Sequence, residues 1–245
     1  MDTTYQPTLP TATGGPYVIC IGRQLGSGGR QIGRRLAEQL HIAYYDSEVL
    51  GLAAHDTGIS RDVFAHSDEH RRGLSRLSSF MSHLAPMVSS TADFYDNQLS
   101  SENLFQLQSQ AIRRAAEEHS CVIIGRAADY VLRHHPRCFS VFVSANMADR
   151  VRRVMEHEHV SSQRAHHLIE HGDRKRADFY NFYSEGTWGA ADTYHLLVNS
   201  SVLGIAETTE MIRQMAVKAL HISEWETDEV ASYSASHGLP EQPRS

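Results

Sequence analysis

Residues Val18 to Gly33 read VICIGRQLGSGGRQIG, an apolar run that breaks into a glycine-rich turn and continues as a basic amphipathic segment. The apolar run is typical of a buried strand, and the segment after the turn is typical of a helix. Backbone N–H groups in such a turn, together with the positive end of the following helix, bind anionic phosphates. The stretch therefore predicts a phosphate-binding loop between a strand and a helix.

The loop departs from the common phosphate-binding pattern G-x-x-x-x-G-K-[ST] at the position of its lysine. Gly29 stands where the lysine would follow Gly28, and Arg30 and Gln31 stand where the magnesium-binding hydroxyl would follow. Either Arg23 or Arg30 can supply the missing positive charge; the alternative is that both hold loop carboxylates. The residues expected to bind the phosphates of a nucleotide are Arg23, Gly26, Ser27, Gly28, Gly29, Arg30 and Gln31.

The composition is that of a globular protein with no electrostatic preference for polyanions. The 245 residues are 41% hydrophobic, with a formal net charge of -6 at pH 7. This balance gives no argument for nucleic acid or an anionic membrane as the main partner. No apolar run approaches the ~20 residues that a membrane helix needs. We expect a cytoplasmic protein whose cysteines, Cys20, Cys121 and Cys138, form no disulfide or metal site.

Strand-like and helix-like segments alternate along the folded part of the chain, which we place at residues 17–222 as a single domain. Residues 1–16 are rich in Thr, Pro and Gly, and residues 223–245 lack apolar periodicity, so both are expected to be flexible tails. The expected strands are 18–21, 42–45, 121–124, 139–143 and 194–198, and the expected helices are 30–40, 104–118, one from 146 onward, and 205–220. This alternation predicts an α/β protein with a parallel sheet covered on both faces.

Three polar segments directly follow strands of the expected sheet. The glycine-rich turn follows the first strand, Asp46 follows the second, and Gly125-Arg126 follows the strand over residues 121–124. Ligands of open α/β sheets bind at the carboxyl ends of the strands. We therefore expect these segments to meet at one edge and to form one site.

Several segments, taken in order along the chain, together resemble the cytidylate-kinase-like family of P-loop nucleoside monophosphate kinases. They are Gly26 to Gly33, Tyr44 to Asp46, Gln108-Ser109, Ile124 to Leu132, Asp173 to Arg176, Trp188-Gly189 and Leu197 to Asn199. The resemblance implies a three-layer P-loop kinase fold with a central parallel sheet, a helical acceptor-binding insertion over about residues 51–103 and a lid over about 156–190. It also implies transfer of the γ-phosphoryl group of ATP, with Mg²⁺, to CMP or dCMP.

Arginines suit such a transfer because their planar fork binds phosphate oxygens through paired hydrogen bonds and stays charged. The candidates with a catalytic role are Arg30, Arg126, Arg174 and Arg176. In the resembled enzymes a Gly-Arg pair at the place of Gly125-Arg126 contacts the acceptor phosphate. An arginine-bearing segment at the place of Arg174 and Arg176 closes over the phosphates there. The alternative for Arg174 and Arg176 is a solvated helix face paired with acids.

The acceptor side of the site is expected to involve Asp46, Gln108, Ser109, Arg126 and Asp129. Asp46 has two candidate roles, to orient Mg²⁺ through water or to cap the helix that follows it. Gln108 lies on an apolar helix face, where its amide needs a partner, either a nucleotide base or an internal backbone group. Asp129 could hold the base or Arg126.

Two further regions leave alternatives open. Apolar residues at helical spacing within 51–100 indicate helices that form the acceptor side of the cleft or, alternatively, a contact in a homodimer. The histidines between 157 and 171 are expected to be solvated, since the H-E-x-x-H pattern is missing. Besides a kinase for nucleoside monophosphates, the sequence is compatible with a nucleotide-binding sensor without turnover and with a kinase for another small acceptor.

Overall fold

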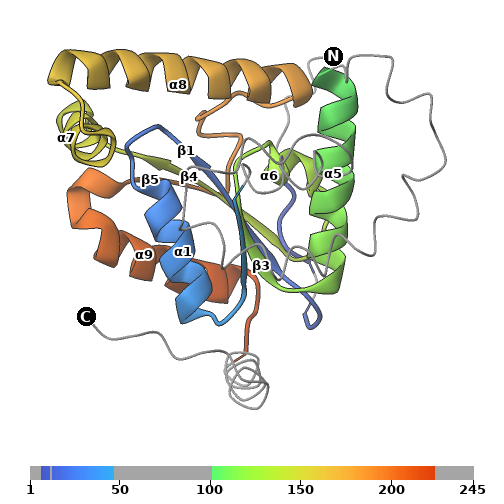
Figure 1. Cartoon of the computed structure of the whole chain (residues 1–245). Helices are drawn as coiled ribbons and strands as arrows, with labels where there is room; N and C mark the ends of the chain where they lie inside the picture. Colours follow the sequence, from blue (N-terminus) through green and yellow to red (C-terminus); the bar gives the residue numbers. More distant parts are fainter. Residues whose placement is uncertain (1–6, 12, 47–100, 224–245) are drawn as a thin grey trace, which may run out of the picture. The chain divides into compact units, whose positions relative to one another are not determined.

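The computed structural model describes residues 7–11, 13–46 and 101–223 (Figure 1). The chain divides into two units, one formed by residues 1–46 with 113–245 and the other by residues 47–112, and each is described by itself. The predicted insertion over residues 51–103 and the predicted tail over 223–245 lie almost entirely outside the described residues. So does any helix that Asp46 could cap.

The first unit contains a parallel sheet of five strands in the order β2-β3-β1-β4-β5 (Figure 1). The strands are β1 (Val18–Arg23), β2 (Ala43–Asp46), β3 (Cys121–Ile124), β4 (Cys138–Ser144) and β5 (Leu196–Asn199). The predicted α/β class and parallel sheet are confirmed. Each expected strand is present, with ends shifted by at most two residues, and the strand over 121–124 is reproduced without change.

The described helices are α1 (Gly29–Gln39), α5 (Ser101–Glu118), α6 (Ala128–Val131), α7 (Met147–Glu158), α8 (Ser162–Tyr183) and α9 (Ser200–Ala219). Helix α9 begins five residues earlier than expected, because a short helical segment precedes a kink at Gly204, where φ is 78° and ψ is 174°. Its first turn is capped by Asn199, whose side chain accepts a hydrogen bond from the backbone N–H of Ser201. This first turn also brings Ser200 to the glycine-rich loop.

Helices α1 and α9 pack against each other and cover one face of the sheet (Figure 1). Apolar residues of β1, β3 and β4 that point to this face meet Leu36 of α1 and Ile212 of α9 in the largest core cluster. Helix α6 packs against β1 and β4. Helices α7 and α8 pack on each other through Val151, Val154 and Ile169, with Leu25 of the glycine-rich loop against this second cluster.

The strand register brings the expected polar segments to one edge. Ile21 pairs with Ile124, and Asp46 pairs with Ile124 from the other side, so the chain leaves β1, β2 and β3 at nearly the same level. The glycine-rich loop, Asp46 and Gly125-Arg126 therefore all lie at the carboxyl edge, as the sequence predicted.

Candidate phosphate-binding site

The glycine-rich loop, residues 22–29, has the backbone of a close-fitting turn. Gly26 and Gly28 have φ angles of 76° and 81°, in the left-handed region that disfavours residues with a Cβ. A Cβ at Gly26 would also lie 2.7 Å from the carbonyl oxygen of Arg150, and one at Gly28 would lie 2.2 Å from Cδ1 of Ile205. Both backbone angle and space therefore require glycine at these two positions.

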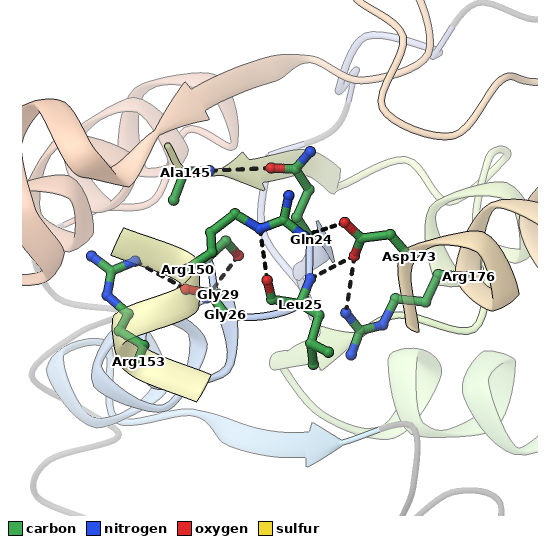
Figure 2. A network of polar contacts seen from close by, with 10 residues as sticks. Gln24, Leu25, Gly26, Gly29, Ala145, Arg150, Arg153, Asp173 and Arg176 are labelled. Atoms are coloured by element: carbon green, nitrogen blue, oxygen red, sulfur yellow. Dashed lines mark hydrogen bonds and ion pairs between the residues drawn. The ribbon is translucent and has the colours of Figure 1, made fainter. Parts of the chain in front are cut away.

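Side chains from α7 and α9 hold the carbonyl groups of the loop, and Figure 2 shows the contacts from α7. Arg150 Nε donates to the carbonyl oxygen of Leu25 at 2.8 Å, and Arg153 Nη1 donates to that of Gly26 at 3.1 Å. The hydroxyl of Ser200 donates to the carbonyl oxygen of Ser27 at 2.6 Å. In a planar trans peptide the N–H group points away from the carbonyl. The N–H groups of Gly26 and Gly28 are thus turned away from these helices, as a phosphate-binding turn needs, whereas the N–H of Ser27 donates to the carbonyl oxygen of Gln24 at 3.3 Å.

Asp173 of α8 fixes the loop from the opposite direction. Its Oδ1 accepts the backbone N–H of Leu25 at 2.7 Å and lies 3.7 Å from Arg176 Nη1, while its Oδ2 is paired with Arg150 (Figure 2). Gly172 lets α8 approach closely, since a Cβ there would lie 3.0 Å from Cδ2 of Leu25. One carboxylate therefore connects the loop, α7 and α8.

The roles of Arg150, Arg153 and Asp173 were missed at the sequence level. Arg150 and Arg153 are three residues apart and share the helix face that meets the loop, whereas Arg152 pairs with Asp149 near the surface. The helical spacing of two arginines around Val151 was the available signal. It could not be separated from an ordinary charged helix face without the position of the loop.

Both arginines that could replace the lysine lie beside Asp46, at the end of β2. Arg30 Nε is 2.7 Å from Asp46 Oδ2, and Arg23 Nη2 is 4.0 Å from Asp46 Oδ1. The Tyr44 hydroxyl lies 3.5 Å from Asp46 Oδ2. The carboxylate that the two arginines approach thus belongs to β2, and it joins the second strand to the loop.

The two arginines differ in environment. The Arg30 side chain is 44% exposed, whereas that of Arg23 is 10% exposed. Burial, together with repulsion from Arg176 and Arg30, lowers the pKa of Arg23 to about 10, although the attraction of Asp46 opposes the decrease. Arg23 remains protonated at neutral pH. It is a buried cation in an environment with an excess of positive charge.

A second feature of the edge is the backbone after β3. Gly125, Arg126 and Ala127 have φ angles of 73°, 58° and 51°, three consecutive residues in the left-handed region. Residues other than glycine adopt this region at a cost that the surrounding structure must offset, and such residues cluster at functional sites. The turn places the Arg126 guanidinium 5.1 Å from the centre of the Phe179 ring on α8, within range of a cation–π interaction.

Asp129, at the start of α6, is buried and bonded to α8. Its Oδ2 accepts a hydrogen bond from the Tyr180 hydroxyl at 2.5 Å. Burial raises the pKa of Asp129 to about 6, although hydrogen bonds from Tyr180 and from backbone N–H groups oppose the rise. In this structure Asp129 binds Tyr180, so its partner differs from both the base and the Arg126 of our sequence-based alternatives.

The other predicted residues are spread more widely. Ser27 is fully buried, and its hydroxyl lies 3.4 Å from the backbone N of Gly29, while Gln31 is exposed on α1. Arg176 lies near Arg23 and Asp173, but Arg174 is exposed on another side of α8. The structure thus brings Arg23, Arg30 and Arg176 together and leaves Arg174 and Gln31 apart from them.

Gln108 and Ser109 lie on α5 within the second unit. Both side chains are buried. Their side-chain polar atoms have no hydrogen-bond partner in the part of the chain that the structure describes. The sequence-based expectation that Gln108 needs a partner therefore remains open for a ligand.

The order β2-β3-β1-β4-β5, with a phosphate-binding turn after the central β1, is the arrangement expected of a P-loop kinase. A sequence profile of the cytidylate kinase-like family matches residues 18–202. The chain belongs to the cytidylate kinase-like family. The fold, as expected from the sequence, is an α/β P-loop kinase fold, and the family supports a kinase function.

Solved structures with the same fold include an uncharacterized protein from Eubacterium ventriosum. Its sequence is 26% identical to that of the present chain, with a TM-score of 0.61 over 82% of the present chain and 98% of the Eubacterium protein. A shikimate kinase from Bacteroides thetaiotaomicron is 14% identical, with a TM-score of 0.45 over 84% and 99%. A gluconokinase from Sinorhizobium meliloti is 14% identical, with a TM-score of 0.42 over 89% and 98%. A comparison with curated proteins gave no match.

Within residues 7–11, 13–46 and 101–223, no group of three or more His, Cys, Asp or Glu residues is arranged to hold a metal ion. The rings of His167 and His171 stack at 6.4 Å on α8. No helix in the described ranges has the length and apolar character needed to cross a bilayer.

Proposed function

We propose that this protein transfers the γ-phosphoryl group of ATP to a nucleoside monophosphate, with CMP or dCMP as the acceptor. The observation that supports it most is the glycine-rich loop itself, whose carbonyl groups are held by Arg150, Arg153 and Ser200. Those contacts turn the N–H groups of Gly26 and Gly28 away from α7 and α9, where an anion can accept their hydrogen bonds. Membership of the cytidylate kinase-like family supports the acceptor class.

Phosphoryl transfer requires the reacting groups to be held in line and the charge on the transferred group to be neutralised. The loop would hold the phosphates of ATP, with Arg23, Arg30 and Arg176 next to it as the cationic groups. Arg126, held in a left-handed turn at the same edge, is proposed to contact the acceptor phosphate. Arg174 would reach the phosphates only if α8 moves, so its proposed role belongs to a closed state of the lid.

Magnesium would enter as part of the MgATP substrate. Mg²⁺ keeps several waters and is bound through one or two carboxylates together with substrate phosphates. The residues fit this mode, because Asp46 is a carboxylate at the phosphate edge. Since Asp46 is also paired with Arg30, its proposed contact with the ion is through water.

Recognition of the base is assigned to the amide of Gln108, assisted by Ser109. A buried amide without a partner among the described residues is costly unless a ligand satisfies it. An amide that both donates and accepts can pair with the edge of a cytosine ring, which also offers a donor and an acceptor. Asp129, bonded to Tyr180, would position α8 and the turn that carries Arg126.

The test is a coupled assay of the purified protein with MgATP and each of CMP, dCMP, UMP and AMP, with nucleoside diphosphate formation followed by chromatography. Diphosphate formed from CMP or dCMP supports the proposal, and removal of magnesium by a chelator should abolish it. Calorimetric binding of ATP or CMP without any product would favour a nucleotide-binding sensor. ATP consumption with another small acceptor alone would favour a different metabolite kinase. Both outcomes would contradict the proposed reaction.

A further inference from the structure

At positions 23 and 29 this loop has a basic residue and a glycine in the reverse of the order that the common phosphate-binding pattern has. In the pattern G-x-x-x-x-G-K-[ST], the first glycine would stand at position 23 and the lysine at position 29. This chain has arginine at 23 and glycine at 29. The positions are six residues apart in sequence, and the loop brings them into contact.

The contact is close enough to exclude two side chains at once. A Cβ added at Gly29 would lie 2.6 Å from Cβ of Arg23 and 3.1 Å from its Cγ. The stem of Arg23 therefore runs through the space that the first atoms of a lysine at position 29 would need. An atom-to-atom approach of that kind requires one of the two residues to be glycine.

The backbone of Gly29 does not itself require glycine. Gly26 and Gly28 have positive φ angles, but Gly29 does not, and it starts α1 in an ordinary helical conformation. A residue with a side chain is compatible with this backbone angle. What prevents a side chain at 29 is therefore the Arg23 side chain.

The charge of Arg23 is available for a phosphate. Its guanidinium lies 4.0 Å from Asp46 Oδ1, beyond hydrogen-bond distance, whereas Arg30 binds the same carboxylate at 2.7 Å. Arg176 and Arg30 both repel it. A buried cation with neighbours of its own sign gains most from an added anion, and phosphate oxygens match the donors of a guanidinium.

We propose that Arg23 supplies the positive charge that binds phosphate in this loop. It takes the place of the usual lysine from the other end of the loop, and Gly29 is glycine to make room for it. This inference rests on the proposed function and names the residue that holds the phosphates of ATP. Asp46 orients the Arg23 side chain, and Arg30, more exposed and already paired, is the secondary contact.

The experiment is an exchange of the two residues, read out as the calorimetric affinity for ATP and ADP and as thermal unfolding followed by circular dichroism. The variants are R23G, G29K and the double variant R23G/G29K, with R23K as the conservative change. The matched control is R113M, which removes one positive charge from an exposed site on α5.

Removal of the cation in R23G should weaken ATP binding about 10- to 100-fold, as expected for lost charge-assisted hydrogen bonds. G29K should lower the unfolding temperature and also weaken ATP binding, because both side chains compete for one space. The double variant should regain ATP affinity to within a few-fold of the wild type, and R23K should retain more affinity than R23G. R113M should bind ATP as the wild type does.

The inference is overturned if folded R23G binds ATP like the wild type, or if the double variant binds no better than R23G. If Arg23 had a merely structural role, R23G would unfold at a lower temperature, and the added G29K substitution would not restore ATP affinity. If the wild type itself binds neither ATP nor ADP, the proposed function fails first. That result is distinct from a wild type that binds nucleotide with no dependence on position 23.

Discussion

Two arginines are buried at opposite ends of the sheet, and their surroundings differ. Arg137 precedes β4 at the amino edge and is 1% exposed. Its Nε and Nη2 donate to the carbonyl oxygen of Leu220 at 3.2 and 2.9 Å, its Nη1 donates to that of Gly15, and its guanidinium lies 5.3 Å from the centre of the Tyr17 ring. Arg23 ends β1 at the carboxyl edge, 4.0 Å from one carboxylate oxygen.

The difference separates a structural arginine from one suited to a ligand. Arg137 donates its hydrogen bonds to backbone carbonyl groups at the C-terminal end of α9 and in the segment before β1, so it joins three parts of the chain. Buried donors are normally satisfied inside the protein. Arg23 has one carboxylate oxygen at 4.0 Å and two arginines, Arg176 and Arg30, that repel it, so a bound anion would stabilise its charge.

The largest expected effect is on the stability of an Arg137→Met variant. The substitution leaves the carbonyl groups of Leu220 and Gly15 without their donor in a buried place, at a cost of about 2 kcal/mol each and about 4 kcal/mol in total. The free energy of unfolding in urea measures it. The parallel change Arg23→Met should cost about 1 kcal/mol or less, since an ion pair at 4.0 Å is lost. A larger loss for Arg23→Met would break the comparison.

Asp129 extends the comparison to a buried acid. Burial raises its pKa in the folded protein to about 6, above the ordinary value of 3.8. The contribution of Asp129 to stability is therefore fully present below pH 3.8 and is lost as the pH rises through 6. From pH 3.8 to 7 the wild type should lose about 3 kcal/mol of stability relative to Asp129→Asn, because one pKa unit corresponds to about 1.4 kcal/mol.

Urea unfolding of both proteins across this pH range gives the difference. The amide in Asp129→Asn keeps an oxygen that can accept a hydrogen bond from the Tyr180 hydroxyl, but it does not titrate. The variant therefore differs from the wild type mainly in lacking an ionisable group. Parallel pH profiles for the two proteins would show that Asp129 has an ordinary pKa.

Asp46→Asn sharpens the account of the phosphate edge. Loss of the carboxylate leaves Arg23 and Arg30 without their shared partner and should cost about 2 kcal/mol, less than for a fully buried pair because Arg30 is half-exposed. Inorganic phosphate should then raise the unfolding temperature of Asp46→Asn more than that of the wild type, since an anion compensates the charge. An equal rise in both proteins would contradict a cationic site at this edge.

Among the substitutions of acidic residues, the smallest expected effect is that of Asp173→Asn, about 1 kcal/mol by urea unfolding. The asparagine can still accept the N–H of Leu25, but it loses the charge that pairs with Arg150 and Arg176. Hydrogen exchange of the Leu25 amide should become faster in this variant, with no change at the amides of β4. Unchanged exchange at Leu25 would show that Asp173 does not restrain the loop.

Much of the fold could be predicted from local pattern. Strand-like runs of four or five residues alternate with amphipathic segments, so the strands and the fold class could be predicted from the sequence, and the turn after β1 indicated the edge of the sheet where a ligand binds. Helix α9 shows the limit. Its first turn precedes a kink at Gly204 and carries Ser200, and no apolar periodicity reveals a single helical turn.

The site was predictable in position and less so in its contacts. The polar segments that follow β1, β2 and β3 meet as expected, because their place is set by strand direction. The partners Arg150 and Asp173 come from α7 and α8, and their meeting with Leu25 depends on how these helices pack. Our proposal of Arg23 over Arg30 likewise rests on the approach of Arg23 to Gly29, which no spacing in the sequence contains.

The most direct measurement is a crystal structure with a non-hydrolysable ATP analogue, Mg²⁺ and CMP. We expect the Arg23 guanidinium at ordinary hydrogen-bond distance from the β- or γ-phosphate oxygens, with the N–H groups of Gly26 and Gly28 donating to the same phosphates. Phosphates bound in the loop while Arg23 makes no contact with them, or a nucleotide bound away from the glycine-rich turn, would contradict the account.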